Sequence, residues 1–233
     1  MADDIPVVVC GHGRYCITSA EAEHPLHEWQ LCPIAATIPV DLPFLDGAEM
    51  DNDPYQTLSS RRVWHSRWYS LRQDAVRFPG GQEGTYTVIE RSDAVFVVPL
   101  TDEGNVVLIR NYRYTVRRWL WEVPAGSVEP GDSPLESARR ELLEETGGLA
   151  RSLIPVGSFY TAPGISDERS HVFLARGVTL GQPEREPGEV MEVHLFPPRR
   201  VMEMIRLGEM LDGPSALSVL LCAPHILSDG LPG

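Results

Sequence analysis

Residues 126–148 read GSVEPGDSPLESARRELLEETGG and contain the most clearly marked helix of the chain. Ser133 has the side chain of a helix N-cap, Pro134 suits the first helical position, and Glu136, three residues after the cap, completes a capping box. The two glycines that end the stretch are a typical C-terminal stop signal. The sequence therefore predicts a helix that begins after Ser133 and ends before these glycines.

Three carboxylates lie on one face of this predicted helix. Glu141, Glu144 and Glu145 are spaced i, i+3 and i+4, so they are neighbours on the helix surface. Carboxylates this close repel one another, and a hard divalent cation with oxygen ligands turns that repulsion into binding. A solvated outer face interleaved with Arg139 and Arg140 has the same spacing, so the helix pattern alone leaves both interpretations open.

Short apolar and alternating segments on both sides of the helix predict strands. Before the helix they are residues 61–71, 86–91, 94–100, 106–110 and 119–123, and after it residues 159–161, 171–175 and 190–196. Residues 198–207 and 214–222 have the pattern of amphipathic helices. Strands and helices mixed in this order predict one α/β domain, which we place at residues 59–225, followed by a tail at residues 226–233.

Residues 1–58 form a predicted acidic, proline-rich extension. Residues 1–60 hold ten acidic side chains and one arginine, which accounts for −9 of the net charge of −13. Six prolines and the lack of a sustained period predict a partly disordered or loosely docked segment. Cys10, Cys16 and Cys32, with nearby histidines, suggest a zinc site, but the Cys-x5-Cys spacing differs from the usual zinc motifs.

The charge balance excludes several classes of partner. The chain has 33 acidic and 20 basic residues, and a protein this acidic lacks the basic surface that nucleic acids and anionic membranes require. All 20 basic residues are arginines, so no catalytic lysine is available. No apolar run reaches the length of a membrane span, and the acidic start differs from a secretory signal, so we expect a cytoplasmic protein with free thiols. A true start at Met50 is a further hypothesis.

The complete stretch 126–148 resembles the Nudix box, a motif of glycine, five residues, glutamate, seven residues and then Arg-Glu-apolar-x-Glu-Glu-x-Gly-apolar. The positions that match in register are Gly126, Arg140, Glu141, Leu142, Glu144, Glu145 and Gly147. Two positions depart from the motif: the first glutamate is Asp132, and the last apolar residue is Gly148, followed by Leu149. The resemblance implies a Nudix-type α/β/α sandwich with a mixed sheet.

The resemblance also implies a metal-dependent hydrolase. In the Nudix family the box glutamates bind Mg²⁺ or Mn²⁺, which activates water to split a diphosphate linked to another group. Carried over by position, Glu141 and Glu145 are the principal ligands, and Glu144 and the Ala125 carbonyl are further ones. Arg140 is expected to orient the box carboxylates. This chemistry suits an acidic protein, because a metal ion neutralises the diphosphate and lowers the pKa of bound water.

A segment beyond the box resembles the ADP-ribose pyrophosphatase branch of the family. Residues 159–170 read FYTAPGISDERS, and Pro163 lies 15 residues beyond Gly148, where that branch has a diagnostic proline. The resemblance implies a homodimer that hydrolyses ADP-ribose to AMP and ribose 5-phosphate. Two alternatives stay open: hydrolysis of UDP- or GDP-sugars, and a non-catalytic ADP-ribose-binding Nudix sensor, although a sensor would be expected to lack box carboxylates.

The same resemblance assigns substrate-binding positions. They are Trp68, Tyr86, Arg91, Arg113, Gly164 and Glu168. The two aromatic rings match positions that stack the adenine, often with one ring from a partner subunit. The two arginines match positions that grip phosphate and ribose, which suits the bidentate guanidinium, and Glu168 matches a contact to the terminal ribose. Half-buried strand aromatics and solvated arginines are the alternative interpretations.

The catalytic base is expected in the acidic loop before the predicted strand at residues 190–196. Glu189 matches a loop acid that binds metal or water in the family, but the neighbouring position, often assigned as the base, is Pro187. We therefore predict Glu189 as base and additional metal ligand, with Glu186 as the alternative base.

Overall fold

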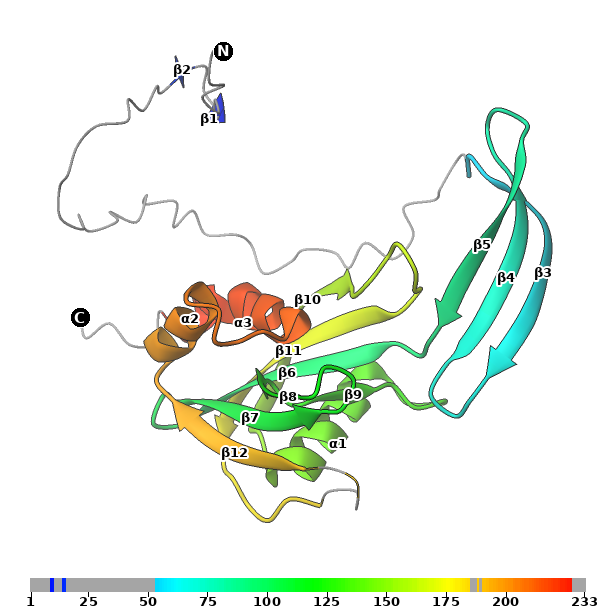
Figure 1. Ribbon diagram of the computed structural model, residues 1–233. Helices are drawn as coiled ribbons and strands as arrows, with labels where there is room; N and C mark the ends of the chain where they lie inside the picture. The colour runs from blue at the N-terminus through cyan, green and yellow to red at the C-terminus, as the bar shows by residue number, and fades with distance from the viewer. Residues whose placement is uncertain (1–8, 11–13, 16–52, 185–187, 189, 228–233) are drawn as a thin grey trace. The chain divides into compact units, whose positions relative to one another are not determined.

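The computed structural model of the protein describes residues 9–10, 14–15, 53–184, 188 and 190–227 (Figure 1). The chain divides into two compact units, Met1–Pro43 and Phe44–Gly233. In the first unit, the backbone of β1 (Val9–Cys10) pairs antiparallel with β2 (Arg14–Tyr15). The side chains of the suggested zinc site, Met50 and most of the predicted extension lie outside the described residues.

A seven-stranded mixed sheet forms the centre of the second unit. Its strands are β6 (Ala94–Thr101), β7 (Val106–Arg113), β8 (Arg118–Glu122), β9 (Ala125–Ser127), β10 (Ser152–Tyr160), β11 (Arg169–Val178) and β12 (Met191–Phe196). The strand order is β10-β11-β6-β7-β12, with β8 paired to β7 and β9 paired to β6. β11 and β6 run parallel, and the other pairs are antiparallel. β6 is therefore enclosed, which explains its almost uninterrupted apolar sequence.

Helices cover both faces of this sheet. α1 (Pro134–Thr146) lies on one face, and α2 (Pro198–Arg206) and α3 (Gly213–Ile226) lie on the other (Figure 1). Because successive strand residues point to opposite faces, β6 contributes to two cores: Val97 packs with α1, and Val98 packs with α2 and α3. The predicted Nudix-type α/β/α sandwich with a mixed sheet is confirmed.

α1 begins and ends where the sequence predicts. Ser133 Oγ accepts a hydrogen bond from the Glu136 backbone N (3.3 Å), and the Glu136 carboxylate accepts one from Ser133 N (2.8 Å), so the capping box is closed. A cap of this kind stabilises a helix by about 1 kcal/mol. Gly147 follows with a φ of 66°, and a Cβ there would lie 2.4 Å from a Gly181 backbone carbon. The stop signal is therefore glycine for reasons of both conformation and space.

The three strands before the central sheet form a sheet of their own. β3 (Gln56–His65), β4 (Ser70–Arg77) and β5 (Glu83–Glu90) pair antiparallel in sequence order. The predicted single strand at residues 61–71 is wrong, because a turn divides it: Ser66 Oγ accepts hydrogen bonds from Trp68 N (3.1 Å) and Tyr69 N (3.3 Å). A serine hydroxyl can replace the backbone partner that a strand residue would otherwise use.

Two strands of the central sheet differ from the sequence prediction. β10 extends over Ser152–Tyr160, whereas the prediction contained only residues 159–161. Its register with β11 shifts between Pro155 and Gly157, and these two residues conceal the strand pattern. The strand predicted at residues 119–123 was expected to be followed by a break at residues 124–126, but pairing with β6 makes residues 125–127 a short strand of their own. No helix in the described part of the chain is long and apolar enough to cross a membrane.

Candidate active site

Glu141 occupies a space that exists because residue 126 is a glycine. The Glu141 side chain projects from α1 toward β9, and only 8% of the residue is exposed. A Cβ added to Gly126 would lie 2.1 Å from both Cδ and Oε1 of Glu141, far closer than atoms can approach. The first glycine of the motif is therefore required for the carboxylate to lie against the strand backbone.

Glu145 reaches the same piece of backbone. Its Oε2 accepts a hydrogen bond from the Ala125 N–H (2.9 Å), and only 5% of the residue is exposed. Glu141 and Glu145 are one helical turn apart, so both carboxylates lie side by side at the Ala125–Gly126 peptide. This is the arrangement that the i, i+4 spacing predicts.

Glu144, the third glutamate, is joined to the site through Arg140. Arg140 Nη1 lies 2.8 Å from Glu141 Oε1 and 2.9 Å from Glu144 Oε2, and Nη2 donates to the Ser127 carbonyl (3.0 Å). Burial lowers the pKa of Arg140, but the charges of Glu141 and Glu144 outweigh that effect and leave the pKa raised. Arg140 thus stays charged and neutralises part of the carboxylate cluster.

The donor chemistry of this cluster fits a hard divalent cation. Glu141 and Glu145 supply carboxylate oxygens beside the Ala125–Gly126 backbone, and no sulfur or nitrogen ligand is among them. Within the described residues, no three acidic, histidine or cysteine side chains already surround one common point. The Arg140 guanidinium instead contacts both Glu141 and Glu144.

Arg91 and Glu168, two of the predicted substrate-binding residues, lie together. Arg91 Nη1 is 3.0 Å from Glu168 Oε1, and the Glu168 side chain is almost fully buried. The backbone supports this pair, because Arg91 N donates to Asp167 Oδ1 (3.1 Å) and Ile89 N donates to the Ile165 carbonyl (2.8 Å). The segment after Pro163 is therefore fixed to the end of β5.

Gly164, in the same segment, borders open space. A Cβ built at this position meets no other atom within 4 Å. The backbone at residue 164 is thus accessible to a ligand in the described structure.

Arg113 has a carboxylate partner that the sequence analysis missed. Its Nε and Nη2 donate to Oε1 and Oε2 of Glu122 (2.7 and 2.6 Å), and Asn111 also donates to Oε2 (3.2 Å). Burial lowers the pKa of Arg113, but the hydrogen bond and charge of Glu122, with smaller effects of Asp212 and Glu145, leave it raised. Glu122 lies within the otherwise apolar run Trp-Leu-Trp-Glu-Val, and a lone acid in such a run was the available signal.

Trp68 and Tyr86 are not brought together within one chain. Tyr86 pairs with Asp74 in β4, whereas Trp68 precedes Ser70, the first residue of that strand. Four residues of strand separate Ser70 and Asp74 by about 13 Å, and Trp68 lies beyond them. The Arg67 guanidinium lies over the Trp68 ring, 4.1 Å from its centre. Because 61% of Trp68 is exposed, the side chain is accessible to a ligand.

Glu186 and Glu189, the predicted bases, lie outside the described residues. The chain on both sides of them is fixed near the box. Glu184 N donates to the Glu144 carbonyl at the end of α1 (2.9 Å), and Tyr112 N donates to the Val190 carbonyl (3.2 Å). The acidic loop therefore begins beside the carboxylate helix and returns beside the end of β7.

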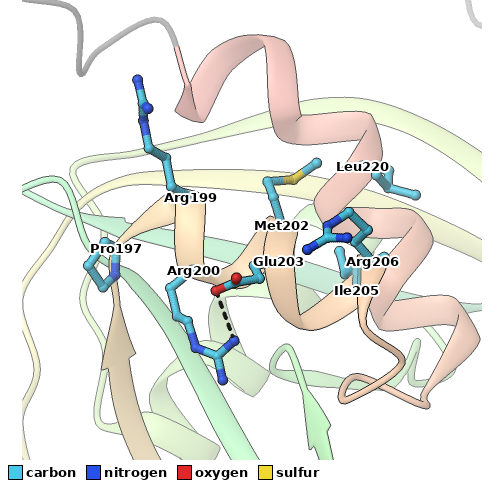
Figure 2. Close-up of a pocket in the computed structure, with 8 residues that line it drawn as sticks. All are labelled: Pro197, Arg199, Arg200, Met202, Glu203, Ile205, Arg206 and Leu220. Carbon is cyan, nitrogen blue, oxygen red and sulfur yellow. Dashed lines mark hydrogen bonds and ion pairs between the residues drawn. The ribbon is translucent and has the colours of Figure 1, made fainter. Parts of the chain in front are cut away.

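A separate hollow lies on the opposite face of the sheet. Figure 2 shows this hollow of about 830 Å³ along α2, lined by Pro197, Arg199, Arg200, Met202, Glu203, Ile205, Arg206 and Leu220. Arg200 pairs with Glu203 (3.3 Å) inside it and with Glu209 (2.5 Å) beside it. None of the predicted site residues lines this hollow, so the box carboxylates and not this hollow define the candidate site.

The comparisons with known proteins identify the family. The NUDIX domain model matches residues 90–212, and the model of the nucleoside diphosphate sugar hydrolase N-terminal domain matches residues 55–89. This chain belongs to the Nudix hydrolase family, which confirms the resemblance drawn from the box. Nudix hydrolases generally need divalent metal ions.

Two relatives and one solved structure are similar to this chain over most of its length. An ADP-ribose pyrophosphatase of Mycobacterium tuberculosis (strain ATCC 25618 / H37Rv) is 35% identical over 184 residues, covering 78% of this chain and 88% of that protein. An ADP-ribose pyrophosphatase of Bacillus subtilis (strain 168) is 32% identical over 169 residues, covering 70% and 90%. The crystal structure of an ADP compounds hydrolase has the same fold, with a TM-score of 0.68 at 22% identity, covering 76% of this chain and 97% of that one.

Proposed function

We propose that this protein hydrolyses ADP-ribose to AMP and ribose 5-phosphate with the help of a divalent metal ion. The observation that carries the proposal is the burial of two carboxylates, Glu141 and Glu145, against the backbone of Ala125 and Gly126. The two relatives named ADP-ribose pyrophosphatase, at 32% and 35% identity over most of the chain, support the choice of substrate.

The proposed ion is Mg²⁺, with Mn²⁺ as the alternative. The ligands of the ion would be Glu141, Glu145 and the Ala125 carbonyl. Glu144 would become a further ligand when Arg140 releases the Glu144 carboxylate. When bound, such an ion neutralises diphosphate charge and lowers the pKa of a water molecule. The oxygen ligands suit both ions, because both prefer hard donors.

The substrate is held by residues around these carboxylates. Arg113 offers its guanidinium to the diphosphate, and Arg91, paired with Glu168, offers a second cation beside a buried acid that can accept hydrogen bonds from ribose hydroxyls. The open backbone at Gly164 allows the sugar to approach this pair. These contacts bind the diphosphate and the ribose, so the adenine is bound by aromatic side chains.

The adenine site and the homodimer are one proposal. Trp68 and Tyr86 are too far apart in one chain to enclose a single base, so we assign the two rings of an adenine site to different subunits. Each base stacked on an aromatic ring contributes about 1–3 kcal/mol. The resulting enzyme is a homodimer whose hydrolase domain covers residues 59–225, between the extension (1–58) and the tail (226–233), and its acidic, lysine-free chain acts in the cytoplasm.

The acidic loop supplies the catalytic base. We assign this role to Glu189, which also binds the metal, with Glu186 as the alternative. Both residues lie between Glu184, which is hydrogen-bonded to the end of α1, and Val190, which is hydrogen-bonded to β7. A loop of this length can place either carboxylate near the metal ligands and the attacking water.

Release of AMP from ADP-ribose tests the proposal. We expect the purified protein with Mg²⁺ to produce AMP and ribose 5-phosphate, and Glu145→Gln to lower kcat by at least about 100-fold, because a metal ligand is lost. In the same assay, the larger loss between Glu189→Gln and Glu186→Gln identifies the base. A panel of UDP- and GDP-sugars ranked by kcat/KM provides the control for substrate choice. A protein that binds ADP-ribose without releasing AMP would instead be a sensor, and the proposal would be wrong.

A further inference from the structure

A buried carboxylate fixes the orientation of Arg113. The two hydrogen bonds from Nε and Nη2 to Glu122, at 2.7 and 2.6 Å, use both carboxylate oxygens and hold the two planar groups edge to edge. Asn111 donates to the same carboxylate (3.2 Å) and fixes it from a second side. The three residues lie on adjacent strands, β7 and β8, so the guanidinium has a rigid support.

The burial of this pair is strongly asymmetric. The Glu122 side chain is 2% exposed, whereas the Arg113 side chain is 47% exposed. A pair that served only the core would have both charged groups enclosed, and such pairs add little stability over apolar residues of similar volume. Here the carboxylate lies inside the protein and the arginine side chain is only half-buried, which is the arrangement expected when a cation is presented to a ligand.

The geometry leaves one edge of the guanidinium available. A guanidinium has five N–H groups, and Glu122 takes the Nε edge of Arg113. Among the described residues, Nη1 of Arg113 has no hydrogen-bond partner. The edge formed by Nη1 and the second hydrogen of Nη2 is therefore free to bind two oxygens of one phosphoryl group.

Two other carboxylates raise the pKa of Arg113 by their charge. Asp212 and Glu145 both attract its charge through space. Asp212 is held as the N-cap of α3, because its Oδ2 accepts from Ser215 N (2.9 Å), and Glu145 is one of the proposed metal ligands.

We propose that Glu122 is a positioning residue for hydrolysis: it fixes Arg113 and directs the free edge of its guanidinium to the diphosphate of the substrate. This inference rests on the proposed function, because it needs a diphosphate bound next to Glu145. It adds a role that neither the box nor the predicted substrate-binding residues contain.

A double-mutant cycle tests the role of Glu122. The variants are Glu122→Gln, Arg113→Ala and the two combined, with Glu209→Gln as the matched control, because Glu209 also forms a two-contact pair with an arginine, Arg200, away from the site. We expect Glu122→Gln to lower kcat/KM for ADP-ribose by about 10- to 100-fold, and to have almost no further effect once Arg113 is alanine. Glu209→Gln should retain the wild-type kcat/KM.

Binding of ADP, measured by calorimetry in the same variants, separates this inference from the choice of substrate. ADP carries the diphosphate, so we expect its Kd to rise about 10-fold in Glu122→Gln and not to rise further in the double variant. If ADP-ribose is not hydrolysed but this pattern is found, only the proposed substrate is wrong. Three results would overturn the inference. The first is an equal ADP affinity in the wild type and Glu122→Gln, and the second is that the two substitutions lower the ADP affinity independently. The third is that the wild type does not bind ADP.

Discussion

The missing side chain of Gly126 creates the space for the Glu141 carboxylate. A methyl group at residue 126 would lie 2.1 Å from that carboxylate, so Gly126→Ala must displace either Glu141 or β9. We expect kcat/KM to fall by at least about 10-fold and the Mg²⁺ concentration for half-maximal rate to rise, because the Glu141 carboxylate is displaced. The loss of stability should be small, because the added methyl group meets only the end of a flexible side chain. Enzyme assays over a Mg²⁺ titration, together with thermal unfolding, provide the measurement.

The control for this substitution is Gly157→Ala. A Cβ at Gly157 would meet its nearest neighbour, Leu221 Cδ1, at 3.8 Å, which is ordinary contact. This variant should keep both the rate and the Mg²⁺ dependence of the wild type. An unchanged Mg²⁺ dependence in Gly126→Ala would mean that Glu141 does not hold the ion in this position.

Single residues differ in how far the sequence alone can assign them. Glu141 and Glu145 were predictable as neighbours, because their contact depends only on helical spacing. Glu122 was not, because its partner Arg113 is set by the register of two strands and not by a local repeat. The distance between Trp68 and Tyr86 also depends on that kind of register, so the sequence could propose both rings but could not place them.

At the scale of structural elements, a network of ion pairs connects the strands of the three-stranded sheet. Asp74 accepts a hydrogen bond from Ser60 in β3 and pairs with Arg72 at 3.0 Å, and Glu90 in β5 pairs with Arg72 at 2.8 Å and Arg62 at 3.1 Å. The Ser60 hydrogen bond, followed by Arg72, lowers the pKa of Asp74, and the Arg72 hydrogen bond, followed by Arg62, lowers the pKa of Glu90. The network thus connects all three strands.

This network predicts acid sensitivity. Because both pKa values are lower in the folded protein, the stabilisation is complete above the pKa of free carboxyls, about 4, and is lost as the pH falls through the folded-state values. We expect Asp74→Asn to lower the midpoint of thermal unfolding by a few degrees at pH 7 and by much less near pH 3. Midpoints measured between pH 2.5 and 7 decide this.

The matched control for Asp74→Asn is Glu83→Gln. Glu83 pairs with Arg77 at 2.9 Å in the same sheet, but both side chains are exposed, and such pairs contribute little. Its unfolding midpoint should follow that of the wild type at every pH. An equal difference between Asp74→Asn and the wild type at pH 3 and pH 7 would show that the charge of Asp74 does not stabilise the sheet.

The helices and strands that could be predicted from the sequence are those whose start and stop signals lie within the element itself. α1 has its cap, its first-turn proline and its glycine stop within 15 residues, and the structure reproduces all three. β9 has only three residues and exists through its pairing with β6, and β10 contains a bulge, so neither has a complete pattern in its own sequence. The turn at Ser66 was concealed because the strands on both sides of it have similar alternation.

At the scale of the whole molecule, the three-stranded sheet is the part that we expect to bind a partner. All ten residues of β3 are exposed, although strands of this length usually lie in a sheet covered on at least one face. Large apolar side chains are exposed on the sheet and its turn: Tyr55, Leu58, Val63, Trp64, Trp68, Tyr69 and Tyr86. Exposed apolar side chains gathered on one sheet are typical of a protein interface, and the adenine site proposed above predicts that the partner is a second copy of this chain.

Val63→Asp tests this assembly, because it places a charge at an exposed apolar position of β3 without entering a core. We expect the wild type to have twice the chain mass of 25.9 kDa in light scattering after size-exclusion chromatography, and Val63→Asp to shift toward the monomer. Since Trp68 and Tyr86 would then lose their opposite subunit, KM for ADP-ribose should rise about 10-fold or more. Leu207→Asp, an equally exposed apolar position on the α2 side, should leave both mass and KM unchanged. A fully active wild-type monomer would contradict the dimer, and one chain would then have to bind adenine without the second ring.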